Sequence, residues 1–309
     1  MQKDKDNIEN TVKNIVISGG GVAGLSFYGA IKQMHKNNHW QLENIENIYA
    51  TSVGTLISIM IALNYEWEEL DNFIKKRPWH KVFKFDISNI FNAIENRGLY
   101  NSDIIADGVR PILLGKDIEL NVTMKEFYEI TGINLFFMSV ELKSMSLVNI
   151  SHKTHPDWKL VDAIYCSCAI PVCFSPYLYN NNYLFDGGVK VNYPIDICLN
   201  DGNKQEETIG VGFRTGTDFL DKELDAENSD DNIDNIDNIS DYNLFDYIMA
   251  LILNLIRSFN THNNNTNNSL YKEVLLDINF PLFNRVSDII NNEELRADLI
   301  EYGIKNTLD

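Results

Sequence analysis

The chain has 309 residues, a hydrophobic fraction of 44% and a formal net charge of −18. This length allows one large α/β domain, and the hydrophobic fraction is typical of a packed globular protein rather than of a disordered chain. The negative charge argues against long-range attraction to nucleic acid or to a strongly anionic membrane, although a local apolar or basic patch can still dock on lipid.

We expect neither a targeting segment nor a membrane-spanning segment in this sequence. The first fourteen residues are polar and charged, without the apolar core of a secretion signal. The two richest apolar runs, 56–63 and 247–256, are shorter than the roughly 20 residues that span a bilayer. We therefore expect a protein of the cytoplasm or of a membrane surface. In that setting the four cysteines are expected to be reduced, buried thiols: Cys166, Cys168, Cys173 and Cys198.

The first part of the chain alternates short apolar strands with helices. The segment 15–18 predicts a buried strand that three glycines stop, and the apolar spacing over 25–35 predicts a helix. A second strand is expected at 45–50, and an apolar helix runs from the turn at Thr51 and Ser52 to Leu63. Strand, turn and helix repeated in this way predict an α/β fold with a parallel sheet between helical layers.

The remaining elements continue the same organisation. Amphipathic helix dominates up to about Leu114, and Pro171 and Pro176 predict a loop between them. Strands are expected at 134–141, 146–150, 183–186, 208–213 and 272–278, and helices at 159–168, 244–259 and 293–307. The acidic, Asn-rich segments 225–242 and 261–268 are expected to be disordered insertions in a single domain over 1–309, with its core at about 15–309.

A glycine turn follows the first strand. Gly19, Gly20 and Gly21 would present backbone N–H groups at the start of a helix, where an anion is stabilised. Such a turn serves either as an oxyanion hole or as a dinucleotide-binding loop, because Gly19, Gly21 and Gly24 fit Gly-x-Gly-x-x-Gly. A dinucleotide site also needs an acidic residue at the end of the second strand, which here ends at Ala50. This counts against a flavin or nicotinamide protein, which remains an alternative.

Ser52 is the candidate nucleophile. It stands at a strand-to-helix turn in Ala50-Thr51-Ser52-Val53-Gly54, and small residues two positions to either side let the backbone pass such a strained turn. The simpler explanation of Ser52 is a helix N-cap.

Asp186 is the candidate base. It ends the strand Tyr183-Leu184-Phe185-Asp186, and Gly187 and Gly188 follow, so the carboxylate would face a cleft. The simpler explanation is a β-turn, for which Asp-Gly is a favoured pair.

The three motifs in this order, each at a strand end, resemble the patatin-like phospholipase family over most of the chain. Further landmarks of the resemblance are Gly98-Leu99-Tyr100, Thr131-Gly132, Asp162-Ala163-Ile164, the run Cys166 to Pro171 with Phe174 and Pro176, and Asp186 to Val189 followed by Asn192 and Pro194. Two positions depart from the family pattern. Ala23 stands where the family usually has a basic residue, and Ala50 replaces the first glycine of the elbow.

The resemblance implies a three-layer α/β/α fold with a mainly parallel sheet, and a lipid acyl hydrolase with a Ser-Asp dyad. Ser52 would attack the ester and Asp186 would take its proton; an Asp of ordinary pKa near 4 is a poor base at neutral pH, so a dry site must compensate. A third catalytic member would have to be His262, in an Asn-rich segment, and is not expected. The implied site comprises the dyad, the oxyanion glycines Gly19, Gly20 and Gly21, and the supporting residues Ala50, Gly54, Gly24, Gly187 and Gly188.

The resemblance also implies the partners. The substrate would be a phospholipid or another lipid ester met at a membrane surface, without a metal or other cofactor; the acidic run after Asp225 lacks the ligand spacing of a calcium loop. A catalytically weak, lipid-binding member of the same fold is the second alternative.

Overall fold

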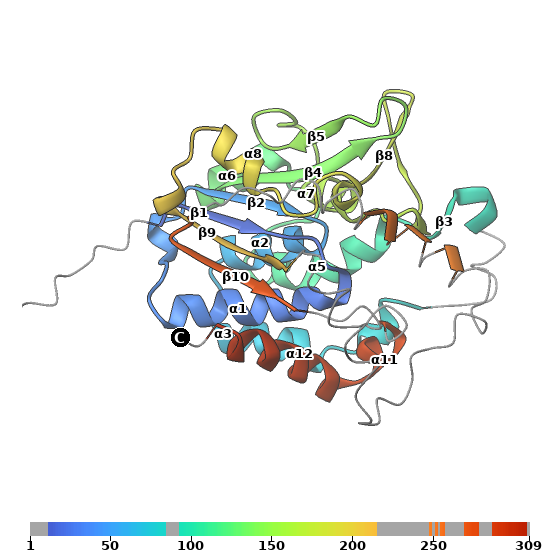
Figure 1. The fold of residues 1–309 in the computed structure, drawn as a ribbon. Helices are drawn as coiled ribbons and strands as arrows, with labels where there is room; N and C mark the ends of the chain where they lie inside the picture. The colour runs from blue at the N-terminus through green and yellow to red at the C-terminus, as the bar shows by residue number, and fades with distance from the viewer. Residues whose placement is uncertain are drawn as a thin grey trace, which may run out of the picture.

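Five parallel strands form the centre of the fold (Figure 1). The computed structural model describes residues 12–84, 93–214, 269–277 and 286–307, with 247–248, 251–252 and 254–256. The parallel strands, in spatial order, are β10 (Lys272–Leu276), β9 (Thr208–Phe213), β1 (Asn14–Ile17), β2 (Asn47–Thr51) and β4 (Asn134–Glu141). The antiparallel strands β5 (Leu147–Ile150), β8 (Asn182–Asp186) and β7 (Tyr177–Tyr179) extend the sheet beyond β4.

Helices cover both faces of this sheet (Figure 1). Along β1, Ile15 and Ile17 belong to the large core on the side of helix α1 (Gly24–Lys36), whereas Val16 packs on the other face with Ile195 of helix α8 (Ile195–Asn200). This alternation is the period of two that a strand buried on both faces requires. The helices are α1 (Gly24–Lys36), α2 (Val53–Ala62), α3 (Trp67–Lys76), α5 (Asp103–Leu114), α6 (Met124–Thr131), α7 (Leu160–Cys168), α8 (Ile195–Asn200), α11 (Val286–Asn291) and α12 (Glu293–Lys305).

Most predicted elements are confirmed, and one prediction is wrong. The expected loop between Pro171 and Pro176 contains the strand β6 (Val172–Phe174), which pairs with β3 (Gly98–Tyr100) in a separate two-stranded sheet. The prolines flank β6 rather than interrupt it, so they do not remove its hydrogen bonds. Most of the helix expected at 244–259, and both expected insertions, lie outside the described residues.

The apolar run after Ser52 forms α2, a helix of ten residues that is almost entirely buried. Within the described ranges of the chain, no helix combines the length and apolar character needed to cross a bilayer.

The C-terminal helix α12 packs closely on α1. A Cβ on Gly29 of α1 would stand 2.1 Å from the carbonyl oxygen of Ile300, and one on Gly303 would stand 1.9 Å from that of Ser26. The two helix backbones are therefore in direct contact, and only glycine fits at these two positions. In this way the end of the chain supports the helix that follows the glycine turn.

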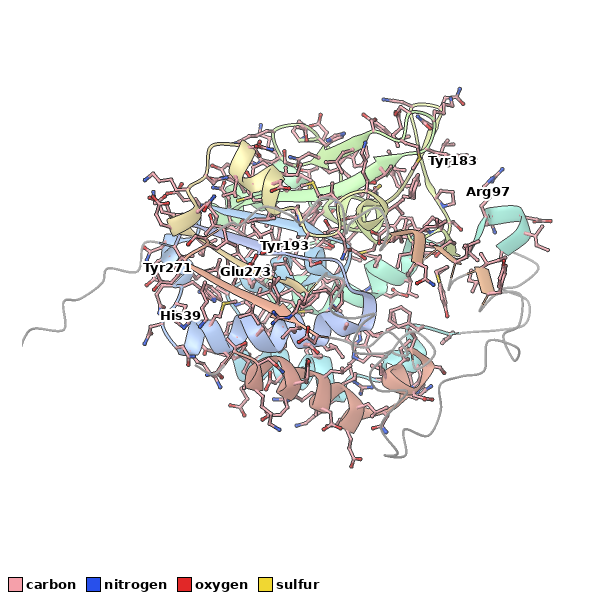
Figure 2. The ribbon with its side chains drawn as sticks, viewed as in Figure 1. His39, Arg97, Tyr183, Tyr193, Tyr271 and Glu273 are labelled. Atoms are coloured by element: carbon pink, nitrogen blue, oxygen red, sulfur yellow. The ribbon has the colours of Figure 1, made fainter. Side chains whose placement is uncertain are left out.

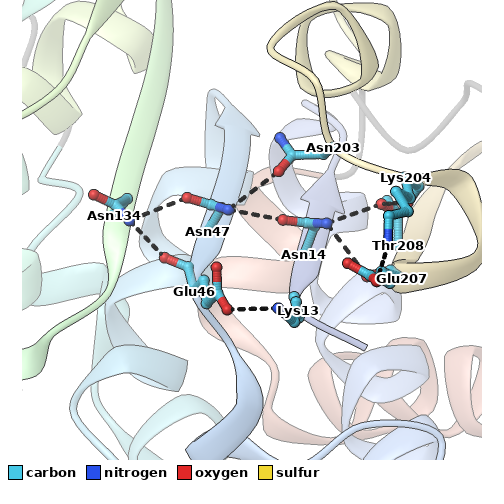
Figure 3. Close-up of polar contacts among 9 residues, drawn as sticks. All are labelled: Lys13, Asn14, Glu46, Asn47, Asn134, Asn203, Lys204, Glu207 and Thr208. Carbon is cyan, nitrogen blue, oxygen red and sulfur yellow. Dashed lines mark hydrogen bonds and ion pairs between the residues drawn. The ribbon is translucent and has the colours of Figure 1, made fainter. Parts of the chain in front are cut away.

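A row of amide side chains crosses the amino ends of the parallel strands (Figure 3). The Nδ2 of Asn134 donates to Oδ1 of Asn47 at 3.1 Å, and Nδ2 of Asn47 donates to Oδ1 of Asn14 at 2.8 Å. Asn14 in turn donates to the hydroxyl of Thr208 at 3.2 Å. These residues are direct cross-strand neighbours, so the row, here called the amide ladder, ties β4, β2, β1 and β9 in one register.

Candidate active site

The sheet register brings Ser52 and Asp186 together. β4 pairs with β2 up to Met138, opposite Thr51, and with β8 from Ser139, opposite Asp186. β5 pairs with β4 along Phe137–Val140 and occupies its other edge, so β8 continues on the edge where β2 ends. β2 and β8 point toward each other, and therefore Ser52 and Asp186 meet at the junction.

Ser52 adopts the strained backbone that the elbow motif predicts. Its φ is +53° and its ψ is −127°, and its side chain is only 6% exposed. Gly54 lies under the end of β1, where a Cβ would stand 2.7 Å from the carbonyl oxygen of Ile17. A backbone held in this rare conformation places the hydroxyl above the start of α2. Ser52 occupies the N-cap position of α2, but its side chain makes no cap hydrogen bond, so capping does not account for its hydroxyl.

Two side chains hold the backbone of Ser52 in place. The Ser52 N–H donates to the hydroxyl of Ser167 at 3.0 Å, and this hydroxyl donates to the carbonyl of Met138 at 2.6 Å. The hydroxyl of Thr55 donates to the carbonyl of Ser52 at 2.7 Å. Both side chains are fully buried, so these bonds are shielded from water. The sequence marks Ser167 only as a landmark of the resemblance, because a contact 115 positions away follows from tertiary packing.

Asp186 is a buried carboxylate with an altered proton affinity. Its Oδ1 accepts a 2.6 Å hydrogen bond from the N–H of Gly188, and the residue is 2% exposed. Burial raises the pKa of Asp186 to about 7, although the nearby Ser52 hydroxyl and the Gly188 N–H lower it in part. Among the described residues, Oδ2 has no fully formed hydrogen bond. The buried carboxylate thus lies near the Ser52 hydroxyl, and it is a stronger base than an ordinary Asp.

The glycine turn lies directly beside Ser52, but its three N–H groups are not equivalent. A Cβ on Gly19 would stand 3.1 Å from the Cβ of Ser52. The N–H of Gly19 donates to the carbonyl of Asn192 at 2.9 Å. The sequence predicts this N–H as a free oxyanion donor, but it already has a hydrogen-bond partner. In the described part of the chain no backbone hydrogen bond uses the N–H groups of Gly20 and Gly21. These two are the remaining candidate donors.

Asn192 connects the glycine turn to the loop after Asp186. Its Nδ2 donates to the hydroxyl of Ser18 and to the carbonyl of Gly19, both at 3.0 Å. The carbonyl of Val191, the residue before Asn192, accepts a 2.9 Å hydrogen bond from the hydroxyl of Thr51. The loop is therefore fixed to the ends of both β1 and β2, which hold the other two motifs.

The predicted supporting residues are small because the elbow and the Asp loop are crowded. Ala50 is fully buried in the main core, which accommodates its methyl group. A Cβ on Gly24 would stand 2.4 Å from Val53, and one on Gly187 would stand 2.2 Å from the carbonyl oxygen of Met138. Gly188 presents its N–H to Asp186. Ala23, the other position that departs from the family pattern, is 3% exposed in the turn before α1.

Tyr193 anchors the Asp loop from the far side of the sheet. Its hydroxyl donates to Oε1 of Glu273 at 2.8 Å, and Figure 2 shows the two side chains meeting beside β10. A Cβ on Gly210 of β9 would stand 1.8 Å from this hydroxyl oxygen. Burial raises the pKa of Glu273, and the hydrogen bond from Tyr193 opposes that rise. Residues of the last third of the chain therefore help to position the loop that carries Asp186.

Comparison with known proteins identifies the family and several relatives of this chain. Residues 15–199, more than half of the chain, match the family model of patatin-like phospholipases. The chain is 27% identical over 197 residues to a probable lipid hydrolase, 463L, of Invertebrate iridescent virus 6, covering 63% of this chain and 66% of that protein. It is 26% identical over 300 residues to the protein R571 of Acanthamoeba polyphaga mimivirus, covering 96% and 93%.

Among solved structures, VipD from Legionella pneumophila aligns with a TM-score of 0.42 and 16% identity, over 70% of this chain and 52% of VipD. The chain thus spans just under two thirds of the length of 463L and about half of VipD.

The chain belongs to the patatin-like phospholipase family. Its fold is α/β with a mostly parallel central sheet between helices, as the resemblance implies. Membership in this family supports lipid ester hydrolysis as the general activity.

Proposed function

We propose that this protein is a lipid acyl hydrolase of phospholipase A type that cleaves fatty acyl esters through Ser52 and Asp186. The observation that carries the proposal is the meeting of a serine at φ +53° with a buried carboxylate of raised pKa, beside a turn with two N–H groups that make no backbone hydrogen bond within the described residues. A nucleophile, a base and an oxyanion site within one small volume are the parts that acyl transfer requires.

The first half of the proposed reaction forms an acyl-enzyme. Oδ2 of Asp186 accepts the proton of the Ser52 hydroxyl while Oγ attacks the ester carbonyl carbon. The resulting oxyanion accepts hydrogen bonds from the N–H groups of Gly20 and Gly21; loss of one such donor typically costs roughly 3 kcal/mol of barrier. The tetrahedral intermediate then collapses, and the departing lipid alcohol takes the proton from Asp186.

The second half releases the fatty acid. Asp186 is again ionised and accepts a proton from water, whose oxygen attacks the acyl carbon. When the second intermediate collapses, Oγ of Ser52 leaves and recovers the proton from Asp186. A pKa of about 7 suits this double role, because the group must accept and donate a proton at neutral pH in each cycle.

A fluorophosphonate probe tests the nucleophile directly. Mass spectrometry should find one labelled serine, Ser52, and no labelling in Ser52→Ala, whereas Ser144→Ala, at an exposed turn, should label like the wild type. Hydrolysis of a short-chain nitrophenyl ester should be lost in Ser52→Ala and in Asp186→Asn. The matched variant Asp196→Asn, on α8, should keep wild-type turnover.

Turnover measurements and an absorption spectrum separate the two alternative functions. Equal turnover by wild type and Ser52→Ala would remove Ser52 from the mechanism and favour a non-catalytic lipid-binding member of the fold. A flavin absorption band in the purified protein, without esterase activity, would favour dinucleotide binding at the glycine turn.

A further inference from the structure

Two hairpin turns lie side by side where β4 ends. The N–H of Leu142 donates to the carbonyl of Tyr183 at 2.9 Å, which continues the ladder between β4 and β8 by one position. Nζ of Lys143 donates to the carbonyl of Asn181 at 2.6 Å. The turn at 142–146 and the turn at 180–181 thus form one surface, here called the hairpin face.

Large apolar side chains are exposed on the hairpin face. Leu178 of β7 lies directly opposite Tyr183 of β8, and Leu142, the residue after β4, donates its N–H to Tyr183, so the three residues form one row across the hairpin face. Leu178 is 62% exposed, Leu142 is 51% exposed, and Met145 at the first turn is 44% exposed. Exposed apolar side chains clustered in this way are typical of a surface that meets a partner.

The charge of this surface differs from that of the whole chain. Three exposed cations lie on it: Nζ of Lys190 donates to the carbonyl of Met145 at 2.8 Å, Lys143 contacts the second turn, and Arg97 stands 5.3 Å from the ring centre of Tyr183. The carboxylates nearby are Glu141, which accepts hydrogen bonds from Ser144 and Ser146, and Glu95, two residues before Arg97. Among the described residues named here, three cations stand beside two carboxylates, whereas the whole chain has a net charge of −18.

From these observations we propose that the hairpin face docks the protein on the surface of a phospholipid bilayer; this inference rests on the proposed function. Leu and Met side chains enter the acyl region of a bilayer, while Lys and Arg pair with phosphates and Tyr lies at the headgroup level. Of the tyrosines in the second hairpin, Tyr183 lies on the same side of the sheet as Leu178, whereas Tyr177 and Tyr179 alternate to the other side and pack on the core. The negative charge elsewhere on the chain is repelled by lipid phosphates and turns this face toward the membrane.

The position of the hairpin face connects docking to catalysis. Strand β8 begins at this face with Asn182 and reaches Asp186 four residues later, which is roughly 13 Å. Figure 2 shows Tyr183 and Arg97 at one end of the molecule, away from His39 and Tyr271 at the other. A bilayer on the hairpin face therefore places lipid esters near the carboxyl ends of β1 and β2, where Ser52 stands.

Vesicle sedimentation tests the proposal with full-length protein. The probe is a vesicle of phosphatidylcholine with a minority of phosphatidylglycerol. The double variant Leu142→Asp and Leu178→Asp should bind at least about tenfold more weakly than the wild type, because it replaces two inserting side chains with charges. The matched control Ile130→Asp, 58% exposed on α6, should bind like the wild type. Met145→Asp provides a second variant if the double variant does not fold.

Hydrolysis of a soluble short-chain ester keeps the two proposals distinguishable. The docking variants should hydrolyse this ester at the wild-type rate and lose activity only on vesicles. Vesicle binding that is equal in the docking variants and Ile130→Asp, or absent in the wild type, would overturn the docking proposal. Absence of ester hydrolysis by the wild type, with vesicle binding still sensitive to Leu142 and Leu178, would instead refute the proposed function.

Discussion

Replacing Asp186 with Asn should abolish turnover and at the same time stabilise the folded protein. The buried carboxylate has a pKa of about 7 in the folded state, compared with 3.8 when unperturbed. Between these two pH values the folded state binds more protons than the unfolded state, so stability falls as pH rises through this window. At about 1.4 kcal/mol per pH unit, the ionised carboxylate costs roughly 4 kcal/mol above pH 7.

Asn removes this cost, and its side-chain oxygen still accepts the hydrogen bond from the Gly188 N–H. The free energy of unfolding in urea, measured at pH 5 and pH 8, checks the reasoning. The gain of Asp186→Asn over the wild type should be larger at pH 8, by an amount on the order of 3 kcal/mol. Asp196→Asn should show no such pH-dependent gain. A stability difference that is independent of pH, or a variant less stable than the wild type at pH 8, would refute the idea that a desolvated carboxylate is held at this site.

Three further results are expected. The pH profile of kcat/KM should rise with pH to a plateau, with its midpoint near 7 rather than near 4, because only ionised Asp186 accepts the Ser52 proton; a midpoint below 5 would contradict the raised pKa. Ser167→Ala should lower kcat on the soluble ester more than it raises KM, and should destabilise the fold by about 1–3 kcal/mol, because it leaves the N–H of Ser52 without a partner. Ser167→Thr keeps the hydroxyl and should recover part of kcat. A wild-type kcat in Ser167→Ala would exclude a positioning role. Gly303→Ala should lower the free energy of unfolding by about 1–3 kcal/mol, since its methyl group would meet the Ser26 carbonyl of α1. The control Gly108→Ala, at a position where a Cβ has open space, should not lower the free energy of unfolding in this way.

The sequence alone predicts the elements that carry a strong local signal. The strands at 134–141 and 208–213 match β4 and β9 because continuous apolar runs between polar ends leave few alternatives. The short strands β6 and β7 are missed, since three residues beside prolines look like a loop. β6 pairs with the distant β3, which the sequence does not mark as a strand, whereas β7 pairs with β8, its neighbour in the sequence.

At the candidate site, sequence reasoning finds the residue types but not their environment. Ser52 and Asp186 follow from motif order, whereas the contact of Ser167 with the elbow requires the packed position of α7. Motif order indicates that a dry site must compensate for the low pKa of an ordinary Asp, but it does not give the value of about 7, because burial of a carboxylate is a property of the folded surroundings. The use of the Gly19 N–H by Asn192 likewise depends on a loop 173 positions away.

The amide ladder has a consequence for which changes of length this fold tolerates. Asn14, Asn47 and Asn134 form one row across the strands. Five residues after each of them, Gly19, Ser52 and Ser139 form a second row at the other end of the strands. Asp186 pairs with Ser139 in this second row. Parallel strands are joined by long crossovers, which do not set the register. An insertion in a crossover therefore does not change the alignment of the three site segments. The gain or loss of one residue inside any of these three five-residue segments, in contrast, would move one catalytic motif by about 3.3 Å. Length variation among relatives should accordingly be found between these segments and not within them.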